Sequence, residues 1–88
     1  MADIKTSLEI KQGIYKHYKG NNYEVIGTAR HSETLEELVV YRALYKSKEF
    51  GKNALWVRPR KMFFEDIEFE GKIVKRFRLL NANIPTSL

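Results

Sequence analysis

Residues 23 to 45 read Tyr-Glu-Val-Ile-Gly-Thr-Ala-Arg-His-Ser-Glu-Thr-Leu-Glu-Glu-Leu-Val-Val-Tyr-Arg-Ala-Leu-Tyr. Two runs rich in β-branched and aromatic residues, Tyr23–His31 and Leu38–Tyr45, flank the polar segment Ser32–Glu37. Such runs favour strands, and a short polar connection is typical of an antiparallel pair. Gly27 weakens an ordinary strand, so its mid-strand position indicates a bulge or sharp bend. We therefore predict two antiparallel strands joined by a loop.

A second hairpin is expected just before this pair. Gly13–Tyr18 favours a strand, and Lys19–Asn22 favours a turn because Gly and Asn tolerate positive φ. In a symmetric hairpin the opposed pairs are Tyr18 with Tyr23, His17 with Glu24, and Tyr15 with Ile26. The face predicted to be buried then holds Ile14, Lys16, Tyr18, Tyr23, Val25, Gly27 and Ala29. The opposite, more polar face holds Tyr15, His17, Glu24, Ile26, Thr28 and Arg30.

The remaining segments predict short elements. We expect a helical segment within 1–12, a loop over 46–53, a strand over 54–58, a helical turn over 60–65, a hairpin of 67–69 with 73–80, and a loose tail over 81–88. The connections are too short for parallel crossovers. The sequence therefore predicts an all-β fold, a partly open barrel of five to six antiparallel strands over 13–80, with a short N-terminal helix.

Composition restricts the class of protein. The chain has 88 residues, 43% of them hydrophobic, and no cysteine. This length supports one domain with a small core, and the lack of cysteine excludes disulfides, thiolate zinc sites and a cysteine nucleophile. No apolar run reaches the roughly 18 residues that a membrane helix needs. The first twelve residues lack the apolar centre of a signal peptide, so we expect no membrane association and a cytoplasmic location.

The formal net charge is +5. Such an excess favours nucleic acid or another polyanion as a partner. Small domains also carry a charge of this size for solubility alone. The basic residues are dispersed rather than clustered in a tail, so both interpretations stay open.

Three strings carry a resemblance to a known family: Gly13–Asn21, Ala29–Arg42, and Leu55–Pro59 followed by Met62 and Phe63. Together they resemble the small bacterial family known as domain of unknown function 1653, over about residues 12 to 80. The resemblance implies a small β-barrel of the SH3-like type. It implies no activity, because no catalytic residues can be carried over from the family. The polar segment Lys46–Asn53 departs from the sharper connection that we expect of the family.

His31, Ser32 and Glu33 are the candidate residues for an enzyme. A hydrolase needs a nucleophile, a base in contact with it and a group that orients the base. Neighbouring residues on a strand point to opposite faces, so His31 and Ser32 do not pair by adjacency. The alternative is that Ser32 and Glu33 shape the loop while His31 hydrogen-bonds into it. We expect no catalytic activity, although the sequence does not exclude it.

Metal and cofactor sites have weaker support. His17 and Glu24 across two strands supply two ligands at most, and a cross-strand hydrogen bond or ion pair explains them better. The glycines are too dispersed for a phosphate-binding loop. We expect no metal and no cofactor.

A set of arginine and aromatic residues is the best candidate ligand site. Its members lie on strands expected to be neighbours, beside the histidine loop: Arg30, His31, Glu33, Tyr41, Arg42, Trp56 and Arg58. Arginine suits phosphate or carboxylate, and a nearby aromatic ring can stack on a base or hold a peptide. The alternative places Trp56 and Tyr41 in the core, with the arginines paired to glutamates. A second basic strip holds Lys75, Arg76 and Arg78, which solvated strand charges also explain.

The sequence thus favours a non-catalytic recognition module for an anionic ligand, nucleic acid or nucleotide, or for a peptide. Two alternatives remain. One is a small enzyme that uses His31, Ser32 or Glu33. The other is a self-association or partner-docking domain, because Leu38–Tyr45 is apolar on both faces and such a strand is covered on both sides or contacts a partner.

Overall fold

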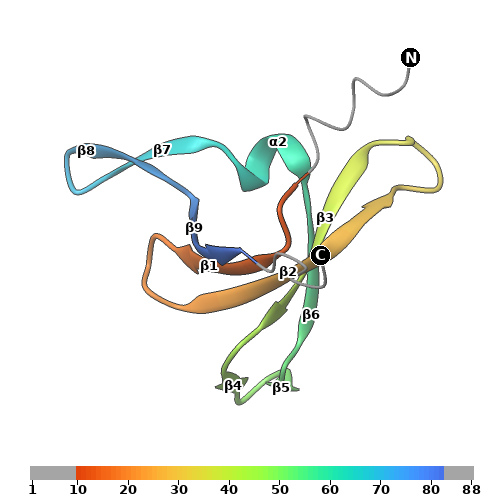
Figure 1. Ribbon diagram of the computed structural model, residues 1–88, viewed down its shortest axis with the longest axis horizontal. Coiled ribbons are helices and arrows are strands. Elements are labelled where there is room, and N and C mark those ends of the chain that lie inside the picture. The colour runs from red at the N-terminus through yellow and green to blue at the C-terminus, as the bar shows by residue number, and fades with distance from the viewer. Residues whose placement is uncertain (1–9, 83–88) are drawn as a thin grey trace, which may run out of the picture.

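The computed structural model describes residues 10–82. The fold is mainly β with antiparallel sheets, as predicted, and its one short described helix lies within the helical turn expected over 60–65 (Figure 1). The elements are β1 (Gly13–His17), β2 (Asn22–Arg30), β3 (Glu37–Ala43), β4 (Lys46–Ser47), β5 (Gly51–Lys52), β6 (Leu55–Pro59), α2 (Arg60–Phe63), β7 (Asp66–Phe69), β8 (Lys72–Lys75) and β9 (Phe77–Ala82). Of the helical segment expected within 1–12, residues 1–9 lie outside the described residues, and 10–12 have no regular secondary structure. The described helix is too short to cross a membrane.

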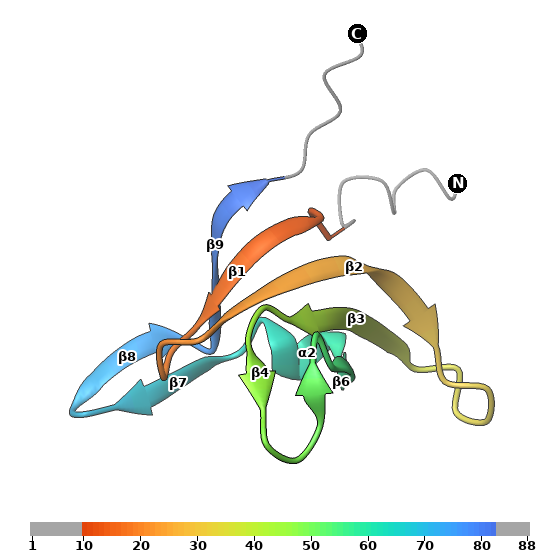
Figure 2. The ribbon, with the colours of Figure 1, turned by 90° about the horizontal axis from the view of Figure 1, so that it is seen from below.

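The main sheet has five strands in the order β6-β3-β2-β1-β9. β2 and β3 are antiparallel, with Tyr23 opposite Ala43 and Arg30 opposite Glu37, which confirms the predicted pair. The register shifts between Val25 and Gly27, so the expected bulge is also present. The sheet curves strongly (Figure 2), but within 10–82 no pairing joins β6 to β9, so it does not close into a barrel.

The register predicted for the first hairpin was wrong. Tyr15, not Tyr18, lies opposite Tyr23. The turn lies earlier in the chain than expected, because the backbone N–H of His17 bonds to the carbonyl of Asn21 at 2.8 Å. A shift by an odd number of residues turns every side chain of a strand to the other face. Tyr15, assigned to the polar face, is therefore 3% exposed and belongs to the core.

Aromatic rings dominate the core on one face of the sheet. Its buried members are Tyr15, Val25, Val39, Tyr41, Phe63 and Phe77. α2 delivers Phe63, whose ring stacks on Phe77 with centroids 4.0 Å apart. The core thus joins the sheet to the helix that follows its edge strand.

The strand predicted over 73–80 is interrupted at Arg76. β8 pairs with β7, whereas β9 pairs with β1, so that Gly13 lies opposite Ala82. The N–H of Arg76 bonds to the carbonyl of Glu65 at 2.9 Å, and its guanidinium bonds to the Met62 carbonyl and the Glu65 carboxylate. As a result β7 and β8 form a separate arm (Figure 2). The expected loop over 46–53 is also more regular than predicted, since β4 and β5 form a small hairpin there.

Candidate functional site

Three of the residues nominated from the sequence meet at one place. Tyr41 of β3 lies directly opposite Trp56 of β6, and Arg58 follows two residues later on the same face. They line a pit together with Tyr23 and Tyr45. The pit has a volume of about 200 Å³ and lies beside the aromatic core. Neighbouring strands, as the sequence suggested, bring these side chains together.

Tyrosine hydroxyls supply much of the polar lining of this pit. The hydroxyl oxygens of Tyr23 and Tyr45 are 2.6 Å apart and share a hydrogen bond. Burial raises the pKa of Tyr23, and the hydrogen bond with Tyr45 raises it further. The phenol of Tyr23 is therefore protonated at neutral pH and carries a proton that it can donate. Trp56 is half-buried, and its ring meets Phe50 edge-on at 5.0 Å.

Arg58 is the cation of the pit. Its Nε donates a hydrogen bond to the Tyr41 hydroxyl at 3.3 Å, and its guanidinium carbon lies 5.8 Å from the centre of the Phe77 ring. The side chain is half-buried, yet no acidic residue between 10 and 82 forms an ion pair with it. A cation withdrawn from water is normally paired with a negative group. The pit therefore suits an anionic ligand.

The other half-buried arginines differ in this respect. Each one meets a carboxylate: Arg42 meets Glu24, Arg60 meets Glu37, and Arg76 meets Glu65. Arg42, although nominated from the sequence, lies on the opposite face of the sheet from Tyr41, with its Nε 3.2 Å from Glu24 Oε1. The expected pairing of His17 with Glu24 was wrong, because Glu24 lies opposite Ile14 and pairs with Arg42.

The remaining nominated residues lie at the β2–β3 loop and do not reach the pit. Arg30 is exposed and donates to the Leu35 carbonyl at 2.9 Å. His31 Nδ1 accepts hydrogen bonds from the backbone N–H groups of Glu33 and Thr34, at 3.1 and 3.3 Å. Ser32 belongs to the same exposed turn. In this geometry the imidazole organises the loop backbone.

The part of the chain that the structure describes contains no group of three His, Asp or Glu side chains placed to hold a metal ion. The polar groups that the pit offers to a ligand include the Arg58 guanidinium and the tyrosine hydroxyls.

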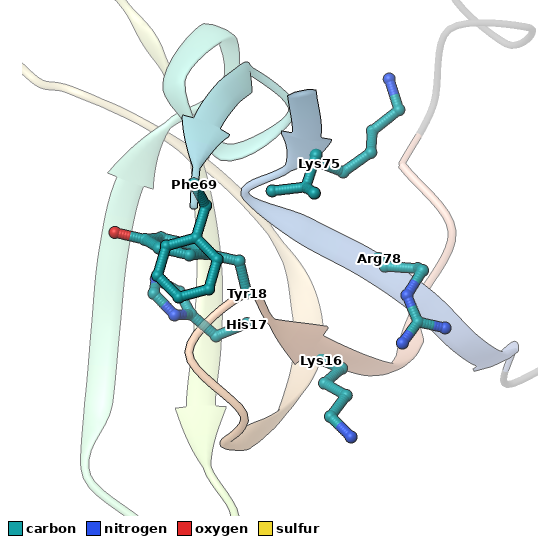
Figure 3. Close-up of a pocket in the computed structure, with 7 residues that line it drawn as sticks. Lys16, His17, Tyr18, Phe69, Lys75 and Arg78 are labelled. Carbon is teal, nitrogen blue, oxygen red and sulfur yellow. The ribbon is translucent and has the colours of Figure 1, made fainter. Parts of the chain in front are cut away.

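Sequence reasoning missed a second, larger cavity of about 350 Å³ (Figure 3). We call it the notch; its lining includes Lys16, Tyr18, Phe69, Lys75 and Arg78. The basic strip of the last strand was a partial signal for it. Its aromatic part had no signal, because Tyr18 and Phe69 are distant in sequence and meet only after the chain turns at the arm.

His17 lies between the notch and the pit. It lines the notch, and its ring centroid is 4.9 Å from Phe77 and 6.3 Å from Tyr23. Its Nδ1 accepts a hydrogen bond from the Lys19 N–H at 3.1 Å. Burial lowers the pKa of His17, and the nearby charges of Arg58, Lys19 and Arg76 lower it further. Positive side chains therefore lie near His17 on several elements.

Comparisons with known proteins agree on one family. The model of the family described as "Protein of unknown function (DUF1653)" matches residues 13–79. A crystal structure of a protein belonging to DUF1653 from Bordetella bronchiseptica superposes with a TM-score of 0.76 at 29% sequence identity. The match covers 89% of this chain and 96% of that one. No curated protein matches the chain.

Proposed function

The chain belongs to the DUF1653 family, and from that premise we propose that it is a non-catalytic recognition module for a phosphate-bearing ligand, a nucleotide or nucleic acid. Arg58 carries the proposal, because it is half-buried, lies beside the Tyr41 hydroxyl and forms no ion pair with any of the described acidic residues. A ligand phosphate would supply the missing negative charge.

The chemistry of the pit suits a phosphate group. The planar guanidinium binds phosphate oxygens through two parallel N–H bonds, and protonated phenols add donors. Aromatic rings such as Trp56 and Tyr45 can stack on a base whatever its identity. The formal net charge of +5 draws polyanions toward the chain.

An SH3-like classification of the fold forms part of the same proposal. The antiparallel order β6-β3-β2-β1-β9 and the strong curvature of the sheet support it (Figure 2). Small curved β domains of this kind use one sheet face and its rim loops for ligands. The pit lies on such a face.

Fluorescence anisotropy with a labelled mixed-sequence oligonucleotide at low salt tests the proposal. We expect wild-type binding that weakens with salt, and a loss of about tenfold or more for Arg58→Gln. Arg42→Gln is the matched control, since Arg42 is half-buried but lies on the other face and pairs with Glu24. Equal affinities for wild type and Arg58→Gln, or no binding of oligonucleotides and nucleotides at all, would overturn the proposal.

A partner-docking role is the second candidate. On the face opposite the pit, Val57 of the edge strand β6 is 57% exposed and lies directly opposite Val40 of β3. Leu55, on the same face of β6, is 62% exposed. An apolar edge strand is a template for pairing with another chain. Light scattering that shows a dimer in wild type and a monomer in Val57→Lys would support this role, and a monomer at all concentrations would exclude a homodimer.

A further inference from the structure

The notch lies where the turn after β1 meets the β7–β8 arm (Figure 3). Tyr18 comes from that turn and Phe69 from the end of β7, and their rings meet edge-on with centroids 5.0 Å apart. Both side chains are only half-buried, so part of each ring remains accessible. Exposed aromatic rings at the wall of a cavity are the usual platform for an unpaired nucleobase.

Two positively charged side chains beside these rings are placed where they destabilise the sheet. Lys16 of β1 and Arg78 of β9 are directly opposed in the ladder. Like charges in this position repel and destabilise a sheet. Neither side chain forms an ion pair with a residue of the described range 10–82. The third cation, Lys75, is held by Asp66 at 3.0 Å. A bound anion would relieve the repulsion between Lys16 and Arg78.

We propose that the notch is the base-binding subsite for a single-stranded nucleic acid. One unpaired base contacts Tyr18 and Phe69, and a phosphate next to that base lies between Lys16 and Arg78. The inference rests on the proposed function and narrows it, because it makes the ligand a strand with an accessible base rather than a free phosphate or a closed duplex.

The path between the two cavities is short. His17 lines the notch and lies 4.9 Å from Phe77, the ring over which the Arg58 guanidinium sits. The notch is therefore in contact, through His17, with the ring that borders Arg58. Lys16 and Arg78 follow His17 and Phe77 in the ladder between β1 and β9, so their side chains lie on the other face of these strands.

Anisotropy titrations with a labelled single-stranded oligonucleotide, the matching duplex and a mononucleotide test this subsite. We expect the single strand to bind more tightly than either of the others. Phe69→Ala should weaken that binding by about 5- to 100-fold, the range for loss of one stacked base. Ile73→Ala is the matched control, since Ile73 is on the same arm and 71% exposed.

Charge variants give a second readout that does not depend on packing. Arg78→Gln and Lys16→Gln should each reduce the slope of log affinity against log salt by about 0.7, the value for one phosphate contact on a single strand. Lys72→Gln, at the tip of the arm, should leave the slope unchanged. Because these charged side chains lie at the surface, their substitution still tests the notch if the Phe69→Ala protein does not fold.

The outcomes separate the two proposals. If Arg58→Gln loses affinity while Phe69→Ala, Arg78→Gln and Lys16→Gln bind as wild type does, the notch is not the subsite and the proposed function stands. If the notch variants lose affinity and Arg58→Gln does not, the notch stands and the role of the pit fails. A duplex that binds as tightly as the single strand refutes base binding, and absence of any binding refutes both.

Discussion

The hydroxyl oxygens of Tyr23 and Tyr45 lie 2.6 Å apart, and this hydrogen bond ties the start of β2 to the turn that follows β3. Because burial raises the pKa of Tyr23, the bond persists across the neutral range. It holds one wall of the pit in which Arg58 is found.

Removing one hydroxyl of this pair should destabilise the fold. Tyr45→Phe leaves the Tyr23 hydroxyl without its partner, and we expect the free energy of unfolding to fall by about 1 kcal/mol. Urea denaturation followed by circular dichroism measures the change. Tyr18→Phe is the control, because the Tyr18 hydroxyl has no hydrogen bond to a described side chain or backbone group. Equal losses in both variants would contradict the assigned role of the Tyr23–Tyr45 bond.

Stability should fall as the solution is acidified through the range in which free histidine titrates. Burial, followed by Arg58, Lys19 and Arg76, lowers the pKa of His17 below its ordinary value of 6.5. The unfolded chain therefore binds a proton before the folded one does, so the contribution is present above 6.5 and is lost as the pH falls toward the lowered value. Denaturation midpoints between about pH 8 and pH 5 measure it.

His17→Phe is the matching control for this pH dependence. It keeps a ring beside Phe77 but removes the titrating group, so the midpoint should change less with pH than in wild type. If the slopes of the two proteins coincide, His17 is not the source of the effect. NMR titration of the His17 ring protons provides a direct measure of the same shift.

The stacked rings at the centre of the core should contribute much more to the free energy of unfolding than an exposed ring does. Phe63 is fully buried and stacks on Phe77, so Phe63→Ala should cost about 3–5 kcal/mol. Phe50 is 57% exposed, and Phe50→Ala should cost less than about 1 kcal/mol. Thermal unfolding of both variants checks the difference, and a large loss for Phe50→Ala would show that the β4–β5 hairpin supports the fold.

One substitution should stabilise the arm. Glu70 and Gly71 join β7 to β8 with φ angles of 52° and 80°, which is the pattern of a type I′ turn. Asn adopts the left-handed conformation more readily than Glu, so Glu70→Asn should slow amide exchange in β7 and β8. Glu68→Asn, within β7 itself, should do the opposite because Asn disfavours strands. Unchanged exchange in Glu70→Asn would refute the assigned turn.

The sequence predicted those parts of the fold that depend on local pattern. The pairing of Tyr23–His31 with Leu38–Tyr45 and the irregularity at Gly27 followed from β-propensity and from one glycine. The face of β1 that is buried could not be predicted in this way, because the position of the turn after His17 depends on backbone hydrogen bonds. The interruption at Arg76 was not predicted, because apolar and basic residues alternate regularly on both sides of it.

The candidate site divides in the same way. Tyr41, Trp56 and Arg58 were found because adjacent strands carry them. Arg30 and Arg42 were grouped with them as residues of neighbouring strands, and His31 and Glu33 as residues of the adjacent loop. The pit excludes Arg42 because it lies on the other face of β3. The notch was missed because it forms only when the arm places Phe69 against Tyr18.

Gly13 and Ala82 are partners in the ladder between β1 and β9. The first and last residues of the described sheet therefore lie side by side. A segment with such ends can be inserted into a surface loop of a host protein without forcing that loop apart. Residues 13–82 are therefore suited to insertion into a surface loop of another protein, as well as to fusion at its end.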